Sequence, residues 1–209
     1  MILNQQTAAK VAEFLLQIKA VKLNPKEPFT WASGIKSPIY CDNRVILSYP
    51  QIRTFVRQQL VEILRESYGR PDVVAGIATG GVPLGSLVAQ EMELPFAYVR
   101  SKAKEHGLQN MIEGIVNPGQ NVILIEDLIS TGGSSLKAVD AVRDRQAIVK
   151  GVIAIFDYNF PIAKENFEKS NCSYYSLSNF NILATVARDK EFITESDYDM
   201  LVEWHSQKV

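Results

Sequence analysis

The segment that most limits the fold lies in the middle of the chain, where four apolar residues, Val122–Ile125, run directly into two acids, Glu126 and Asp127. Four apolar residues in succession are typical of a strand that is buried on both faces of a parallel sheet. The next residues read Leu-Ile-Ser-Thr-Gly-Gly-Ser-Ser and lead into a predicted helix over 135–145. A buried strand, a glycine-containing loop and a helix in this order indicate an α/β protein.

The rest of the chain repeats this alternation. Apolar runs predict strands at Val73–Ala78, Phe96–Arg100 and Val149–Phe156, and apolar periodicity predicts helices over 5–20, 50–68 and 84–91. We therefore expect a mostly parallel sheet flanked by helices on both faces. Residues 24–44 differ, because prolines and glycines punctuate them, and they predict a turn-rich pair of short strands. Open parallel sheets bind ligands beyond the carboxyl ends of their strands, so the chemistry is expected there.

Composition excludes several classes of protein. The 209 residues are 46% apolar with a formal net charge of -1, which predicts a single globular domain over 1–209 and argues against a nucleic-acid binder. Cys41 and Cys172 are too few for a disulfide framework and too isolated for a zinc site. No apolar run approaches the ~18 residues of a membrane span, and the first residues lack a secretory signal pattern. These observations predict a cytoplasmic protein that contacts neither nucleic acid nor membrane.

The loop after the acids has the chemistry of an anion site. Gly132 and Gly133 allow backbone N–H groups to approach a ligand, and the following helix presents its positive end. Hydroxyls that can donate hydrogen bonds come from Ser130, Thr131, Ser134 and Ser135. The loop suits one phosphate, whereas the acids suit ribose hydroxyls or water on a magnesium ion. The alternative is a solvated loop with an N-cap serine. A P-loop is excluded because no lysine follows the glycines, and the spacing is not that of the dinucleotide fingerprint.

This strand, acid pair and loop resemble the signature of the phosphoribosyltransferase family. Two further segments resemble the orotate phosphoribosyltransferase branch of that family: residues 29–44, which contain a Ser-Gly-x-x-Ser-Pro core, and residues 100–107, which are basic and rich in polar residues. The resemblance extends over residues 5 to 205. It implies a phosphoribosyltransferase-type α/β fold with an N-terminal hood, residues 1–48, over the acceptor base.

The resemblance also implies partners and roles for individual residues. The enzyme would use Mg²⁺ and transfer the phosphoribosyl group of phosphoribosyl pyrophosphate (PRPP) to orotate. It would act as a homodimer in which a mobile loop closes over the neighbour's active site in trans. The residues implied to bind PRPP are Thr79, Gly80, Arg100, Lys102, Lys104, His106, Glu126, Asp127, Leu128, Ile129, Ser130, Thr131, Gly132, Gly133 and Ser134. Those implied in catalysis are Asp127, Lys102, Lys104 and His106, and the magnesium would be held mainly by substrate and water near Asp127 rather than by direct protein ligands.

The acceptor site departs from the family at several positions. Many members have lysine at the positions of Ala32 and Ser101 and near Gly80, and arginine near Tyr158. We expect orotate to contact Lys36, Tyr40, Arg44 and Ser130 instead. Because a guanidinium can grip a carboxylate with two hydrogen bonds, Arg44 is the predicted anchor of the orotate carboxylate. The alternatives are that Arg44 forms a structural ion pair with Asp42 and that Lys36 is the anchor.

Three rival functions remain at this stage. They are a transferase of the same superfamily with another base as acceptor, a regulatory module that senses PRPP without catalysis, and a PRPP synthetase. The hood segment argues against the first, the lack of a basic patch against the second, and the lack of a recognisable ATP site against the third.

Overall fold

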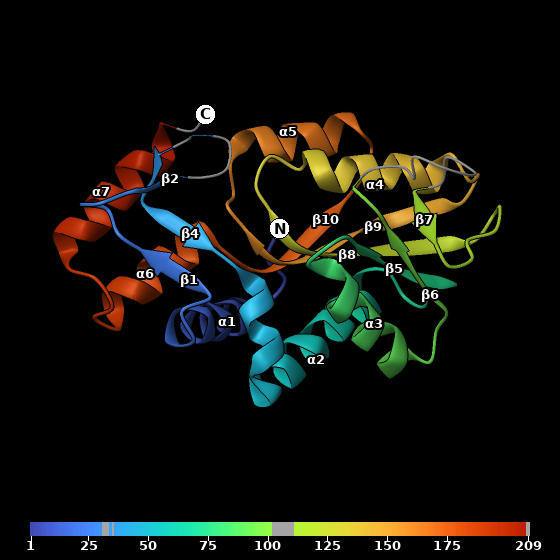
Figure 1. The fold of residues 1–209 in the computed structure, drawn as a ribbon, viewed down its shortest axis with the longest axis horizontal. Coiled ribbons are helices and arrows are strands. Elements are labelled where there is room, and N and C mark those ends of the chain that lie inside the picture. The colour runs from blue at the N-terminus through green and yellow to red at the C-terminus, as the bar shows by residue number, and fades with distance from the viewer. Residues whose placement is uncertain (31–33, 35, 102–110, 208–209) are drawn as a thin grey trace.

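A six-stranded sheet forms the centre of the molecule in the computed structural model, which describes residues 1–30, 34, 36–101 and 111–207 (Figure 1). The strand order is β10-β9-β8-β5-β6-β7, and all neighbours are parallel except β7, which runs antiparallel to β6. The bounds are β5 (Val73–Ile77), β6 (Phe96–Val99), β7 (Ile112–Glu113), β8 (Asn121–Ile129), β9 (Ile148–Asp157) and β10 (Tyr174–Asn179). The predicted mostly parallel α/β sheet is thus confirmed.

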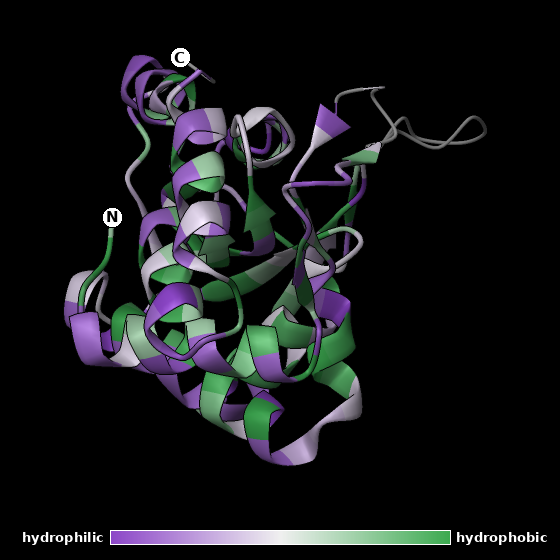
Figure 2. Ribbon diagram, turned by 90° about the vertical axis from the view of Figure 1, so that its left-hand side faces the viewer, coloured by the Kyte–Doolittle hydropathy of each residue, from purple (hydrophilic) through white to green (hydrophobic). Residues whose placement is uncertain are grey.

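Helices cover both faces of this sheet (Figure 1). On one face lie α1 (Gln5–Gln17), α2 (Pro50–Ser67) and α3 (Gly81–Met92), and on the other lie α4 (Gly133–Arg143) and α5 (Pro161–Lys169). Along β8, Val122 and Leu124 point into the core under α4, while Ile123 and Ile125 point into the core under α2 and α3. Both faces are therefore apolar, which explains the uninterrupted apolar run in the sequence. Figure 2 shows mostly apolar strands in the centre and, around them, helices in which apolar and hydrophilic residues alternate.

A smaller region stands at one end of the sheet, and we call β1 to β4 together with the 3-10 helix η1 the hood (residues 21–48). Strand β1 (Val21–Leu23) pairs with β4 (Ile39–Cys41), and β2 (Phe29–Thr30) pairs with β3 (Lys36–Ser37), in both cases antiparallel. Helix η1 (Asn43–Ser48) returns the chain to the sheet. The first helix, α1, packs against β10 and the C-terminal region, so the hood strands begin only at Val21.

The hood rests on two C-terminal helices that the sequence analysis did not predict, α6 (Phe180–Asp189) and α7 (Glu195–Ser206) (Figure 1). The indole Nε1 of Trp204 donates a hydrogen bond to the carbonyl oxygen of Lys36 at 3.4 Å, and Lys26 pairs with Asp197 at 3.3 Å. The imidazole of His205 stacks on Phe180, with ring centroids 4.3 Å apart. Helix α7 therefore lies against the hood.

The central strand is longer than the sequence indicated. Strand β8 continues through Glu126 and Asp127 to Ile129, because its partner β9 also extends, with Leu128 opposite Phe156. The acids are consequently strand residues rather than loop residues. None of the helices in the described part of the chain is both long and apolar enough to cross a bilayer.

Candidate active site

A crevice is expected where β5 and β8 lie side by side. The chain leaves β5 into α3 on one face of the sheet and leaves β8 into α4 on the other face. At such a topological switch point the two loops diverge and leave a ligand site outside the carboxyl ends of the strands. The turn after β5 contains Thr79 and Gly80, and the loop after β8 contains Ser130 to Ser134, so both predicted phosphate loops meet here.

The turn after β5 packs directly against the end of β8. A Cβ atom on Gly80 would collide with the carboxylate of Asp127, and one on Gly81 would collide with the carbonyl oxygen of Ile125. Only glycine allows the backbone to approach this closely. The exposed Thr79 stands beside these glycines, facing solvent.

The two acids point to opposite faces of the sheet because they are successive residues of one strand. Glu126 lies under α4, only 4% exposed, and its carboxyl accepts hydrogen bonds from the Ser135 hydroxyl at 3.2 Å and the Asp127 N–H at 3.0 Å. Burial, together with the neighbouring Asp127 carboxyl, raises the pKa of Glu126 well above its usual range. Asp127 is half-buried and lies against Gly80 on the other face. Of the two, Asp127 is therefore the carboxylate that faces the switch point.

The loop from Ser130 to Ser134 is open to a ligand on one side and supported on the other. Gly132 has a φ of +80°, a conformation that favours glycine, and a Cβ atom there would lie 2.8 Å from the ring of Phe167. The Asn166 side chain donates a hydrogen bond to the Thr131 carbonyl at 3.0 Å. Helix α5 thus buttresses the loop from behind.

The front of this loop presents the start of α4. Thr131, Gly133 and Ser134 are exposed there, and the N-cap residue Gly132 has no side chain to cap the helix. The N–H groups of the first turn consequently remain available for an anion. Leu128 and Ile129, which the resemblance included among the PRPP contacts, are strand residues, Leu128 half-buried and Ile129 fully buried.

Two hollows flank the carboxyl ends of β5 and β6. The larger, about 560 Å³, is lined on the α3 side by residues that include Arg44, Thr79 and Arg100. The smaller, about 160 Å³, is lined on the α4 side by Arg100, Ser134 and Lys137 among others. Arg100 borders both hollows and forms an ion pair with Glu113 at 3.5 Å.

The sequence analysis did not identify Lys137 as a site residue, although its position one helical turn after Ser134 was a usable signal. The remaining predicted cations of this segment, Lys102, Lys104 and His106, lie outside the described residues.

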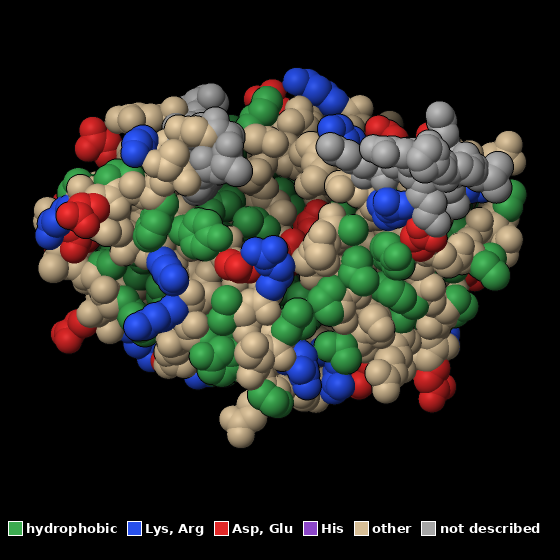
Figure 3. All heavy atoms as spheres, in the orientation of Figure 1, with side chains coloured by type: hydrophobic (Ala, Val, Ile, Leu, Met, Phe, Trp, Pro, Cys, Tyr) green, Lys and Arg blue, Asp and Glu red, His purple; other side chains and the backbone are tan. Residues whose placement is uncertain are grey.

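The hood supplies the residues predicted for the acceptor. Arg44 holds Asp42 with two hydrogen bonds, from Nε at 2.6 Å and from Nη2 at 2.8 Å, so the ion pair raised as an alternative role is present. Figure 3, in the orientation of Figure 1, shows acidic and basic side chains next to each other near the middle of the face that is seen there. Lys36 donates to the Thr30 hydroxyl at 2.8 Å, and Tyr40 packs near Phe29.

Among these hood residues, the larger hollow reaches Arg44 but neither Lys36 nor Tyr40. The structure therefore brings Arg44 together with Thr79 and Arg100. Tyr158, at the position where many relatives have arginine, is buried and stacks on Phe160 with centroids 5.4 Å apart. The Tyr158 ring therefore packs in the apolar core beneath the hood.

A parallel sheet with an uncapped helix start at its switch point, beside the half-buried Asp127 carboxylate, is typical of α/β proteins that bind sugar phosphates. Comparison with known proteins identifies which one. The family model described as "Phosphoribosyl transferase domain" matches residues 45–187. A protein of Phocaeicola vulgatus named orotate phosphoribosyltransferase is 52% identical over 193 residues, covering 92% of this chain and 91% of that protein. The chain belongs to the phosphoribosyltransferase family, and within it to the orotate phosphoribosyltransferases.

Solved structures agree with this assignment. Orotate phosphoribosyltransferase from Aeropyrum pernix superposes with a TM-score of 0.76 at 25% identity, covering 88% of this chain and 99% of that one. UMP synthase from Leishmania donovani superposes with a TM-score of 0.81 at 26% identity, covering 96% of this chain. This chain spans only 42% of the Leishmania protein's length.

The raised pKa of Glu126 predicts a pH dependence of stability. A buried carboxyl binds its proton more tightly in the folded state, so it favours folding fully below the unfolded pKa and loses that contribution as the pH rises through the folded pKa. The amide of Glu126→Gln does not ionise. Its melting temperature should therefore rise relative to the wild type as the pH increases from about 5 to about 8.

Scanning calorimetry across this pH range measures the difference between the two curves. Glu203→Gln, which changes an exposed acid of α7, serves as the matched control and should follow the wild type. Parallel curves for Glu126→Gln and the wild type would show that Glu126 is ionised in the folded protein.

Proposed function

We propose that this protein transfers the 5-phosphoribosyl group of PRPP to orotate, giving orotidine 5'-phosphate and pyrophosphate in pyrimidine biosynthesis. The observation that carries the proposal is the pairing of an uncapped helix start at Gly132–Ser134 with the Asp127 carboxylate at the switch point of the sheet. The loop suits the 5-phosphate, and the carboxylate suits the ribose. The named relatives, half identical over almost the full chain, support orotate as the acceptor.

The chemistry needs positioning and charge rather than a nucleophilic side chain. As the bond from C1 of the ribose to pyrophosphate breaks, C1 develops oxocarbenium character, as in glycosyl transfer generally. The Asp127 carboxylate would stabilise this positive charge, and the N–H groups of α4 would hold the 5-phosphate. Arg100, together with Lys102, Lys104 and His106 of the adjoining loop, would stabilise the leaving pyrophosphate. Thr79 and Gly80 would bind it through their backbone.

Magnesium fits this arrangement as a partner of the substrate. A bound Mg²⁺ would supply positive charge that offsets the negative charge of the substrate's phosphates. It prefers six oxygen ligands and retains several waters. Asp127 offers one carboxylate at the crevice, so PRPP and water would supply most of the ligands.

The hood would bind orotate between Ser130 and the side chains of Lys36, Tyr40 and Arg44. We also propose a cytoplasmic homodimer in which the loop of each subunit completes the partner's site in trans. The unpaired thiols of Cys41 and Cys172 support a reducing compartment.

The activity is tested by following orotate absorbance in the presence of PRPP, with and without Mg²⁺.

The same assay tests the role of Asp127. Asp127→Asn keeps the shape of the side chain and removes its charge, so kcat should fall by ~10²-fold or more, the scale of one preorganised electrostatic contact. Asp140→Asn, on the exposed side of α4, is the matched control and should retain full activity. Activity with a purine base instead of orotate would overturn the proposed acceptor, and a nearly unchanged kcat in Asp127→Asn would limit Asp127 to a structural role.

The predicted anchor of the orotate carboxylate is tested by Arg44→Lys, which keeps the positive charge but cannot donate two parallel hydrogen bonds to a carboxylate. If Arg44 binds the orotate carboxylate, the KM for orotate should rise at least several-fold, while the KM for PRPP stays within about twofold. Arg143→Lys, whose guanidinium binds the carbonyls of Ser170 and Asn171 far from the hood, controls for the general effect of the exchange. Equal losses for both substrates with a lowered melting temperature would mean that the pair with Asp42 is structural.

Sharing of the loop between subunits is tested by complementation. Lys104→Ala and Asp127→Asn should each be nearly inactive alone. Mixed under subunit exchange, they should recover activity, because one site of each heterodimer is then built from intact parts. Proven exchange without recovery would place the loop in its own subunit's site.

A further inference from the structure

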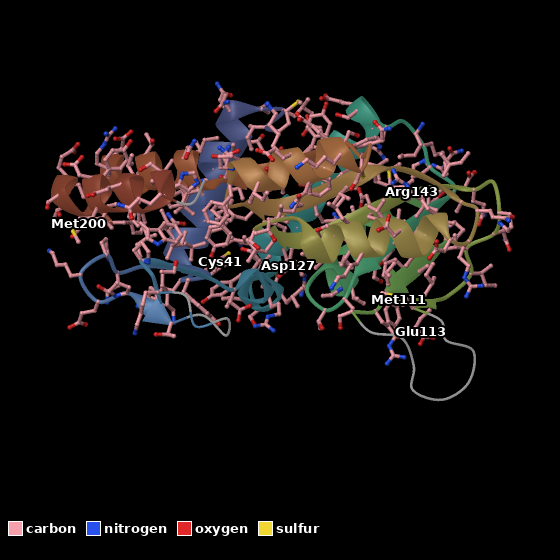
Figure 4. All side chains as sticks on the ribbon, turned by 90° about the horizontal axis from the view of Figure 1, so that it is seen from above. Cys41, Met111, Glu113, Asp127, Arg143 and Met200 are labelled. Atoms are coloured by element: carbon pink, nitrogen blue, oxygen red, sulfur yellow. The ribbon has the colours of Figure 1, made fainter. Side chains whose placement is uncertain are left out.

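Asn43 is a fully buried polar side chain that joins the hood to the central strand. It begins η1, and its Nδ2 donates a hydrogen bond to the main-chain carbonyl oxygen of Asp127 at 2.6 Å, across 84 residues of sequence. Figure 4 shows the labelled Cys41 and Asp127 close to each other where the hood meets β8. This hydrogen bond joins η1 of the hood to the main chain of β8.

The orientation of the Asn43 amide is fixed by a second contact. The thiol of Cys41 donates to Oδ1 of Asn43 at 3.3 Å. Burial, followed by the nearby Asp127 and Asp42 carboxylates, raises the pKa of Cys41, which keeps the thiol protonated and able to donate. With Oδ1 occupied in this way, Nδ2 must face the Asp127 carbonyl.

Both ends of the Asn43 contact lead to the proposed site. At one end, the peptide whose carbonyl accepts the hydrogen bond belongs to Asp127, whose side chain lies against Gly80. At the other end, η1 carries Arg44 and Leu47 to the wall of the larger hollow. A shift of Asn43 would therefore move both Asp127, on the proposed PRPP side, and η1, on the proposed orotate side.

We propose that Asn43 is a positioning residue that holds the Asp127 carboxylate in register with the hood, so that the sugar phosphate and the acceptor base are aligned. This inference rests on the proposed function, because it assigns Asp127 to the ribose. Asn43 itself touches no reacting atom.

The test uses Asn43→Asp, which has nearly the same shape but donates a hydrogen bond only when protonated. At pH about 8 its carboxylate would face the Asp127 carbonyl without a proton, and kcat should be at least ~10-fold below the wild type, with PRPP binding weakened several-fold. As the pH falls toward about 5.5, the protonated form restores the donor, so the ratio of variant to wild-type kcat should rise. A purely structural role would not produce this pH-dependent rescue.

Asn179→Asp is the matched control. Asn179 is the N-cap of α6, where its side chain accepts from the Ile182 N–H, and a carboxylate accepts equally well. Its ratio to the wild type should stay near one at every pH. If the Asn43→Asp ratio is independent of pH, or if its kcat stays within about twofold of the wild type at pH about 8, the proposal is overturned.

A second pair of variants covers failure of Asn43→Asp to fold. Cys41→Val removes the thiol donor that orients the amide, whereas Cys41→Ser retains a donor. The valine variant should lose kcat several-fold and the serine variant should recover most of it, and equal values in the two would overturn the proposal. PRPP affinity, measured by calorimetry without any acceptor, should follow the same order. A wild type that binds PRPP but does not consume orotate would count against the proposed acceptor only, since the order in PRPP affinity would still decide the role of Asn43.

Discussion

The close approach of the turn at Gly80 and Gly81 to the end of β8 is the constraint on which the site depends. A side chain at Gly80 would collide with the Asp127 carboxylate and one at Gly81 with the Ile125 carbonyl, so only the bare glycine backbone can lie this close to β8. This contact brings the β5 turn and the end of β8 together at the switch point, with the Asp127 carboxylate beside Gly80. The α3 and α4 helices then diverge on opposite faces, which leaves the crevice open.

The environment of each acid follows from strand geometry. Because side chains alternate along β8, Glu126 points into the core beneath α4 and Asp127 points toward the switch point. The buried carboxyl is bound by the Ser135 hydroxyl, and its raised pKa favours the neutral form. The two adjacent acids therefore differ in burial and in access to a ligand, and Asp127 is the one that a ligand at the switch point can reach.

The hood depends on contacts from distant parts of the chain. Asn43 joins it to Asp127, while Trp204 and the Lys26–Asp197 ion pair join it to α7. Short two-stranded pairs are marginally stable alone, so these contacts hold the hood in place. On the opposite side, Asn166 and Phe167 of α5 support the phosphate loop. The hood and the loop after β8 are thus each supported by elements from other parts of the chain.

The sequence by itself determined the α/β class, the central strand and its phosphate loop, because apolar runs, glycines and hydroxyls act locally along the chain. The sequence also indicated a second ligand-binding loop at Thr79 and Gly80. The tertiary structure decided what depends on contacts between distant segments. Strand β8 runs past the acids because β9 pairs with it, Glu126 is buried because α4 covers it, and Arg44 lines a hollow together with Thr79 and Arg100. The role of Asn43 has no sequence signal at all, since its partner lies 84 residues away and only folding brings the amide to the carbonyl.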